Sequence, residues 1–305
     1  MDEVQENIRL DGRVAIVTGA GRGLGRGYAL ALSRRGARVV INDLIEGSGR
    51  SAVSAADTVV EEIRSGGGDA LAHHADVTRA DQVDDMIESA IRAWGRVDIL
   101  VNNAGIVRDR SFAKLSAEDF RQVMDIHLFG AFHCSKAVWR HMRDREYGRI
   151  VSIVSAAGLF GNFGQANYAA AKMAIVGLTN TLSQEGVRQG IRSNCFAPAA
   201  ATRMTEDLLP PDVSARLNPE TVAPGLVYLC SENAPNGVIL AAAGGSYSRV
   251  MIQETRGVFL SGEDNSPEAV EAGWSAISDS GGLLLPTTAS EHVGRFLAQA
   301  KGEDA

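Results

Sequence analysis

A glycine-rich turn between an apolar strand and a helix constrains the fold of this chain more than any other feature. Residues 14–18 form a short apolar run, and Thr18-Gly19-x-x-x-Gly23-x-Gly25 leads directly into a helical pattern at 28–35. Glycine lets the backbone turn tightly and approach a pyrophosphate, and the following helix offers its first N–H groups to the phosphates. The turn predicts a dinucleotide site, with a βα turn that binds no ligand as the alternative.

The order of apolar runs and helical patterns predicts the fold class. Further strand-like runs lie at 38–42, 70–75, 97–101, 150–154, 191–196 and 238–242, and helical patterns separate them. This alternation is typical of an α/β fold with a doubly wound parallel sheet and helices on both faces. We expect residues 1–245 to form a dinucleotide-binding and catalytic domain. Residues 246–305 are expected to form a C-terminal extension, packed on the same domain or on a neighbouring subunit.

Composition limits the classes of partner. The 305 residues are 45% hydrophobic and 6% aromatic, with a formal net charge of −7, which argues against a general nucleic-acid or membrane-surface role. Cys134, Cys195 and Cys230 are far apart and lack metal-ligand spacing, so we expect reduced thiols, no metal and a cytoplasmic protein. No segment reaches transmembrane length, and the charged first twelve residues do not resemble a signal peptide.

Strand ends supply further cofactor candidates. Asp43 ends the second apolar run, where a carboxylate can bind the ribose hydroxyls and repel a 2′-phosphate, so it favours NAD over NADP. Arg22 is a contrary signal, since a cation in the glycine turn can meet that phosphate. Asp76 follows the third run and either contacts the adenine or caps the next helix. Asn103, after the fourth run, either lies beneath the cofactor or braces neighbouring strands.

A second motif carries acid–base chemistry. Ser155 follows the strand-like run 150–154, and a glycine-containing loop leads to Tyr168 and Lys172, four residues apart on one helix face. An ammonium beside a phenol stabilises the phenolate, so we expect it to lower the tyrosine pKa. Such a pair moves a proton on and off a carbinol oxygen. The Tyr-x-x-x-Lys spacing alone is a weak signal of function, because any solvated helix face can carry it. The serine thirteen residues upstream of the tyrosine makes the motif more specific.

These motifs together resemble the short-chain dehydrogenase/reductase family over residues 12–245. The resemblance rests on Thr18-Gly19-x-x-x-Gly23-x-Gly25, Asn102-Asn103-Ala104-Gly105, Ser155 and Tyr168-x-x-x-Lys172. It implies that Tyr168 is the general base, Lys172 lowers its pKa and holds the nicotinamide ribose, and Ser155 orients the substrate oxygen. The cofactor residues it implies are Gly19, Arg22, Gly23, Leu24, Gly25, Asp43, Asp76, Val77, Asn103, Ala104, Gly105, Tyr168, Lys172, Pro198 and Thr202.

Other segments are similar to the (3R)-hydroxyacyl-CoA dehydrogenase branch of this family. They include Arg-Asp-Arg-Ser-Phe-Ala at 108–113 and Gly-Asn-Phe-Gly-Gln-Ala-Asn-Tyr at 161–168, and His127 replaces the asparagine common elsewhere. The branch implies a (3R)-3-hydroxyacyl-CoA substrate, a homo-oligomer and a proton-relay role for His127, with a packing histidine as the alternative. The chain ends in Gly-Glu-Asp-Ala, which is no peroxisomal address, so we expect a free-standing enzyme.

A CoA thioester requires a cationic mouth on this acidic protein. Arg108, Arg110 and Arg203 fall on predicted loops at the carboxyl edge of the sheet, although surface arginines are often merely solvated. Residues expected to cover the acyl chain are Met204, Leu208, Leu209 and Trp274. Two other functions stay open: a dehydrogenase of a steroid or another apolar alcohol, and an NAD-binding redox sensor without turnover.

Overall fold

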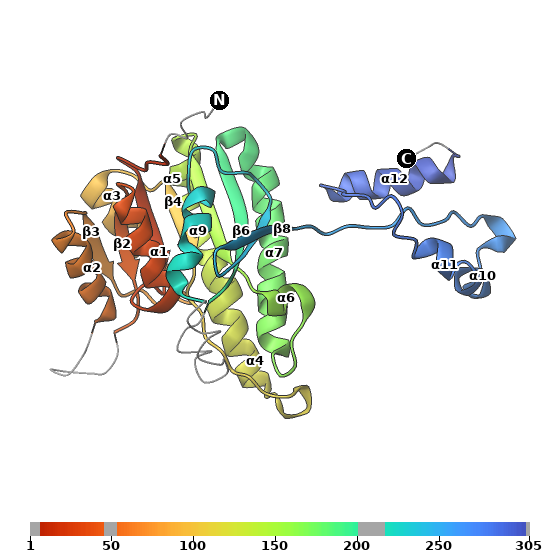
Figure 1. The fold of residues 1–305 in the computed structure, drawn as a ribbon, viewed down its shortest axis with the longest axis horizontal. Coiled ribbons are helices and arrows are strands. Elements are labelled where there is room, and N and C mark those ends of the chain that lie inside the picture. Colours follow the sequence, from red (N-terminus) through yellow and green to blue (C-terminus); the bar gives the residue numbers. More distant parts are fainter. Residues whose placement is uncertain (1–6, 46–53, 201–216, 303–305) are drawn as a thin grey trace. The chain divides into compact units, whose positions relative to one another are not determined.

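An eight-stranded sheet in the order β3-β2-β1-β4-β5-β6-β7-β8 is the frame of the structure (Figure 1). The structure is a computed structural model, and it describes residues 7–45, 54–200 and 217–302. The strands are β1 Val14–Thr18, β2 Arg38–Asn42, β3 Ala70–His73, β4 Ile99–Asn102, β5 Gly148–Ile153, β6 Ile191–Ala199, β7 Ile239–Ala243 and β8 Ser246–Val250. Neighbouring strands from β3 to β7 are parallel, which confirms the predicted fold class.

Helices cover both faces of the sheet, because successive strand residues point to opposite sides. Ala15 and Val17 of β1 face one hydrophobic core, and Val14 and Ile16 face the other. The first core lies under α1 (Gly23–Arg34), α2 (Ala55–Ser65) and α9 (Ala223–Leu229). The second lies under α3 (Ala80–Trp94) and α5 (Gly130–Asp144). Strands buried on both faces explain the continuous apolar runs in the sequence.

Three local features differ from the expected elements. The predicted helix over 117–145 is divided into α4 (Ala117–Met124), a π-helical turn (Asp125–Phe129) and α5. The loop expected after Ser155 contains a short helix, α6 (Ala156–Phe160), before α7 (Ala166–Gly186). The strand predicted at 250–253 is wrong beyond Val250, which is the last residue of β8. That strand begins at Ser246, directly after a Gly244-Gly245 turn with φ values of 53° and 84°. Two positive φ angles suit a tight hairpin turn, which sequence periodicity did not reveal.

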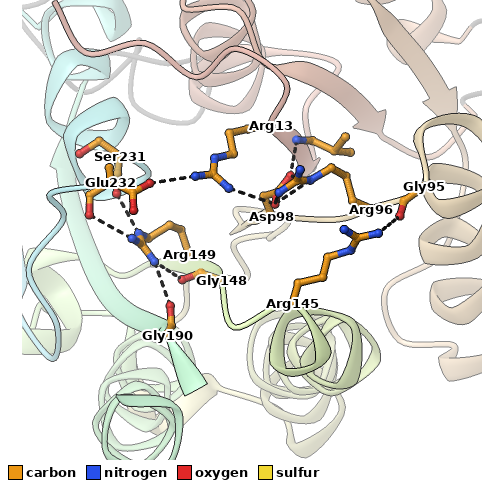
Figure 2. A network of polar contacts seen from close by, with 11 residues as sticks. Arg13, Gly95, Arg96, Asp98, Arg145, Gly148, Arg149, Gly190, Ser231 and Glu232 are labelled. Atoms are coloured by element: carbon orange, nitrogen blue, oxygen red, sulfur yellow. Dashed lines mark hydrogen bonds and ion pairs between the residues drawn. The ribbon is translucent and has the colours of Figure 1, made fainter. Parts of the chain in front are cut away.

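A polar network ties the strands together at the edge of the sheet opposite the glycine turn (Figure 2). The fully buried Asp98 accepts a hydrogen bond from Val14 N at 2.8 Å and pairs with Arg96. Arg149, also buried, donates to the carbonyls of Ser231 at 2.8 Å and Glu232 at 3.0 Å. The network therefore joins the starts of β1, β4 and β5 to the segment after α9.

Residues Met1–Arg249 and Val250–Ala305 form two separate units. The described part of the second contains α10 (Pro267–Ala272), α11 (Trp274–Ile277) and α12 (Ala289–Ala300). Glu254 is its polar centre, since it pairs with His292 Nδ1 at 2.8 Å and with Arg295 Nε at 2.9 Å. No side chain in the described part of this unit is fully buried, although its helices carry apolar faces.

Among the described residues, no helix is long and apolar enough to cross a membrane. The same residues hold no group of three or more side chains suited to bind a metal ion. Cys134, Cys195 and Cys230 are buried free thiols.

Candidate active site

The glycine turn lies where the strand order reverses, between β1 and β4, which is where ligands bind in open α/β sheets. Gly19 and Gly23 have φ values of 61° and 53°, a region that favours glycine. A Cβ at Gly25 would overlap the Gly19 carbonyl and lie 2.5 Å from Asn103 Nδ2. Glycine at these positions therefore lets the turn close tightly before α1.

Asn103 braces the strands, the second of its two predicted roles. Its Nδ2 donates to the carbonyls of Thr18 and Gly19, both at 2.9 Å. Thr18 Oγ1 accepts from the backbone N–H groups of Asn103 and Ala104, each at 3.0 Å. The sequence motif included Thr18 but did not reveal that its hydroxyl locks the glycine turn to the loop after β4.

Asp43 lies at the end of β2 beside the glycine turn. Its Oδ2 accepts from Gly21 N at 2.8 Å, and its Oδ1 accepts from Leu44 N at 2.9 Å. A Cβ at Gly21 would lie 2.6 Å from Oδ2, so glycine there makes room for the carboxylate. The two backbone bonds fix an anion at the position predicted for ribose recognition.

Asp76 has a local role that differs from the predicted helix cap. Its Oδ1 accepts from Thr78 N at 2.9 Å and from Thr78 Oγ1 at 2.8 Å, whereas the N-cap of α3 is Arg79. Two residues separate Asp76 from the N-cap Arg79, so its carboxylate closes a turn before the helix.

A cavity of about 1070 Å³ joins the glycine turn to the Tyr168 helix. The predicted cofactor residues that line it are Gly19, Arg22, Gly23, Leu24, Gly25, Asp43, Asp76, Val77, Asn103, Ala104, Gly105, Tyr168, Lys172 and Pro198. Thr202 lies outside the described residues. Leu44, Ile45, Ile106, Gln122 and Asp125 also line the cavity and were not predicted. They follow strand ends or lie on α4 and the π-helical turn, where the sequence pattern gives no distinct signal.

Ser155, Tyr168 and Lys172 come together as the motif predicts. Ser155 is the N-cap of α6, and its Oγ accepts from Ala157 N at 3.2 Å. The buried Lys172 donates from Nζ to the Ile153 carbonyl at 2.7 Å. Its Nζ lies 5.5 Å from the centre of the Tyr168 ring. The end of β5 thus anchors the ammonium one helical turn beyond the phenol.

His127 lies on the π-helical turn and contacts Tyr168. The two rings meet edge to face with centroids 5.2 Å apart. Nε2 is 2.8 Å from the Ile106 carbonyl oxygen and 3.1 Å from Ile106 N, while the buried Nδ1 has no protein partner. A Cβ at Gly105 would overlap the imidazole, so glycine at 105 makes room for the ring.

Burial is the largest cause of the pKa shifts of Tyr168, Lys172 and His127. Burial raises the pKa of Tyr168, a hydrogen bond to Ser155 lowers it, and the charge of Asp109 raises it. Burial lowers the pKa of Lys172 to about 7. Burial and then the charge of Lys172 lower the pKa of His127 to about 3. The predicted lowering of the Tyr168 pKa by Lys172 does not appear in this structure, where burial outweighs the hydrogen bond to Ser155 and Lys172 is not among the groups that shift that pKa.

The predicted substrate contacts are only partly described. Arg108 and Arg110 are exposed on the loop after β4, and Arg108 Nε donates to Gln122 Oε1 at 3.2 Å. Arg203, Met204, Leu208 and Leu209 lie outside the described residues. Trp274 belongs to the second unit, where it is exposed.

Comparison with known proteins decides the family. The family model described as short chain dehydrogenase matches residues 13–211, more than half of the chain. The chain belongs to the short-chain dehydrogenase family. As a member it is an NAD-dependent oxidoreductase, as the sequence motifs predicted.

Individual relatives of this short-chain dehydrogenase are longer proteins or bind a nicotinamide cofactor. Mouse peroxisomal multifunctional enzyme type 2 is 44% identical over 94% of this chain and 39% of its own length. The full-length Drosophila melanogaster enzyme of that name has a solved structure with a TM-score of 0.82 and 38% identity, over 97% of this chain and 51% of its own. This chain thus spans about half or less of those two proteins. A solved 7α-hydroxysteroid dehydrogenase, complexed with NADH and 7-oxo glycochenodeoxycholic acid, has a TM-score of 0.71 and 33% identity, over 79% of this chain and 96% of its own.

Proposed function

We propose that this dehydrogenase oxidises (3R)-3-hydroxyacyl-CoA to 3-ketoacyl-CoA with NAD. The observation that carries the proposal is the single cavity with a phosphate-compatible glycine turn and Asp43 at one end and Tyr168 and Lys172 at the other. The resemblance of residues 108–113 and 161–168 to the (3R)-hydroxyacyl-CoA dehydrogenase branch supports an acyl-CoA substrate.

The residues around the cavity fit NAD. The glycines of the turn leave the backbone open to a pyrophosphate, and α1 directs its first N–H groups toward the same space. Asp43 accepts from the backbone N–H groups of Gly21 and Leu44, and a carboxylate at this strand end suits a ribose with free hydroxyls. When bound, NAD supplies the acceptor for the hydride that leaves the carbinol carbon.

The protein's part of the reaction is to hold the alcohol and remove its proton. Ser155 is proposed to hydrogen-bond the substrate oxygen, and the Tyr168 phenolate to take its proton as general base. Lys172, anchored at the Ile153 carbonyl, is proposed to contact the nicotinamide ribose. His127 stays neutral at physiological pH, since its pKa is about 3, so it can relay a proton only as a neutral imidazole with one donor and one acceptor nitrogen.

Recognition of the thioester is proposed to use cations outside the cavity. Arg108 and Arg110 are exposed on the loop that begins at the cavity and offer guanidinium groups to phosphate oxygens. Arg203 is proposed to join them, and Met204, Leu208, Leu209 and Trp274 are proposed to cover the acyl chain.

A steroid or other apolar alcohol is the second candidate substrate. The 7α-hydroxysteroid dehydrogenase with its bound 7-oxo bile acid favours it, because that chain is 33% identical. Purified enzyme assayed with NAD on both epimers of 3-hydroxyacyl-CoA esters and on free steroid alcohols separates the two. Preference for the 3R ester supports our proposal. Turnover of the free steroid alone supports the second, and absence of hydride transfer with every alcohol supports a redox sensor.

We propose that the protein forms a homo-oligomer in the cytoplasm. Phe129 and Phe132 are 49% and 40% exposed near the His127 turn, and we propose that they help to form a homodimer or tetramer interface. Trp139, on α5 like Phe132, packs partly buried against the core. The extension is proposed to bury its apolar helix faces on its own first unit or on a neighbouring subunit. The three free thiols support a reducing compartment, proposed to be the cytoplasm, although the multifunctional relatives are peroxisomal by name.

A further inference from the structure

The ladder of hydrogen bonds between β2 and β3 stops beside Asp43. Asp43 N donates to the His73 carbonyl at 3.1 Å, as in a regular parallel ladder. The next bond of such a ladder would run from Ala75 N to the Asp43 carbonyl. Ala75 N donates instead to Nδ1 of the His73 ring at 3.2 Å, and the Asp43 carbonyl oxygen lies 3.1 Å from Nδ1 of the His74 ring. Two imidazole rings thus replace the last bond of the ladder.

The His74 ring joins the end of β2 to the start of α2. Because a carbonyl oxygen can only accept, the bond to Asp43 requires the proton on Nδ1 of the ring. The other ring nitrogen, Nε2, lies 3.7 Å from Asp57 Oδ2. Asp57 is held in turn, since its N–H donates to the side chain of the N-cap residue Ser54 at 3.0 Å. Both nitrogens of the ring therefore face an oxygen of a neighbouring element, which fixes the orientation of the ring.

The Asp43 carbonyl belongs to the same peptide group as the Leu44 N–H. That N–H donates to Asp43 Oδ1 at 2.9 Å, while Gly21 N donates to Oδ2 at 2.8 Å. A peptide group is planar, so a bond that fixes its carbonyl also fixes the direction of its N–H. The His74 ring therefore holds, through one peptide group, one of the two donors that orient the Asp43 carboxylate.

We propose that His74 is a positioning residue for dinucleotide binding: by holding the peptide group between Asp43 and Leu44, its ring keeps the Asp43 carboxylate in the orientation that binds a ribose. This inference rests on the proposed role of Asp43 in NAD binding. His74 is not among the described residues that line the cavity, so it acts through Asp43 and not by contact with the cofactor. Without the ring the peptide group can rotate, and the carboxylate then loses the Leu44 donor and binds the ribose hydroxyls less well.

The test compares variants that remove or keep the bond from Nδ1. His74→Phe keeps an aromatic ring and removes the donor, while His74→Asn keeps an amide N–H close to the position of Nδ1. His141→Phe is the matched control: the His74 and His141 side chains are 32% and 30% exposed, and His141 lies 3.9 Å from a carboxylate oxygen of Glu88. Calorimetric titration with NAD gives the dissociation constant, and steady-state kinetics separate KM for NAD from kcat.

His74→Phe is expected to raise the dissociation constant and KM for NAD about fivefold, with kcat unchanged. His74→Asn should restore most of the affinity, and His141→Phe should bind NAD like the wild type.

A double-mutant cycle with Asp43→Ser shows whether His74 acts through the carboxylate. In the Asp43→Ser background His74→Phe should have no further effect, because the carboxylate that it positions is gone. Wild-type affinity in His74→Phe, or an equal loss with and without the Asp43 carboxylate, overturns the inference. An Asp43→Ser protein that binds NAD as tightly as the wild type contradicts the proposed role of Asp43 instead.

Discussion

At the scale of single residues, the proposed chemistry depends on the hydroxyl of Tyr168. Tyr168→Phe retains the ring that meets His127 edge to face and removes the group that takes the proton. General-base removal is expected to lower kcat by about 10²-fold or more, with NAD affinity nearly unchanged. Steady-state kinetics and NAD titration by calorimetry measure the two quantities. Near wild-type turnover would refute the assignment.

Asp43 is the residue expected to decide between the two nicotinamide cofactors. Asp43→Ser removes the anion beside the predicted ribose and should lower kcat/KM with NAD about tenfold while raising it with NADP. The ratio of kcat/KM values for the two cofactors is the measurement, with Asp84→Asn, at an exposed position on α3, as the control for a lost carboxylate. A wild-type enzyme that uses NADP as well as NAD would contradict our interpretation of Asp43.

Lys172 makes the stability of the NAD-free protein depend on pH. Its pKa falls from 10.5 to about 7 on folding, so the unfolded chain binds more protons between those values and wild-type stability rises with pH there. The cost of the buried ammonium is full below pH 7, at most about 5 kcal/mol. A variant without the ammonium also loses the hydrogen bond to the Ile153 carbonyl, which reduces its gain in the free energy of unfolding by about 1 kcal/mol.

Lys172→Met is therefore expected to raise the free energy of unfolding near pH 6, with a gain that disappears as pH approaches 10.5. Urea unfolding at several pH values measures it. A gain that grows with rising pH would show that Lys172 is not buried as a charge.

The residue scale also shows the limit of sequence-based prediction. Ser155, Tyr168 and Lys172 were placed correctly because strand ends and helical spacing alone bring them together. The directions of the Lys172 and Tyr168 pKa shifts could not be predicted, since they depend on how deeply the two side chains are buried. His74 gave no signal, because its contact with Asp43 joins the ends of two strands, 31 positions apart.

At the scale of secondary-structure elements, the starts of the central strands depend on Arg149. Its guanidinium reaches the carbonyls of Gly148, Gly190, Ser231 and Glu232 and lies 4.2 Å from the centre of the Tyr147 ring. Lysine has no planar fork to serve several acceptors, so Arg149→Lys should lower the free energy of unfolding by about 2 kcal/mol. Urea unfolding measures the change, and Arg140→Lys, at an exposed position outside the network, is the control with little expected effect. Equal stability of the two variants would contradict the network's importance.

Element boundaries show why part of the fold could not be predicted. The parallel strands were predictable, since each is an apolar run buried on both faces. The π-helical turn Asp125–Phe129 was not, because an extra residue in a helix leaves the apolar spacing of its flanks nearly intact. β8 was missed because its residues Ser246–Arg249 are exposed and mostly polar.

At the scale of the whole molecule, we expect self-association. The rings of Phe129 and Phe132 and several apolar side chains on the helices of the extension are exposed, and exposed apolar patches mark protein–protein interaction sites. Sedimentation velocity is expected to give a dimer or tetramer, and Phe129→Ser combined with Phe132→Ser should shift it toward a monomer by weakening that contact. Val187→Ser, at another exposed apolar position, is the control. A wild-type monomer at assay concentration would contradict the prediction.

The Arg149 network and Ser155 lie near opposite ends of one strand, with residues 149 and 155 separated by six positions, or about 20 Å. Substitutions that far apart, with no shared partner, have nearly additive effects. Stability and catalytic activity thus depend on residues at opposite ends of the same strand. Substitutions in the Arg149 network can therefore be chosen to raise resistance to heat or solvent. Substitutions near Ser155 can be chosen independently to change which alcohol is oxidised.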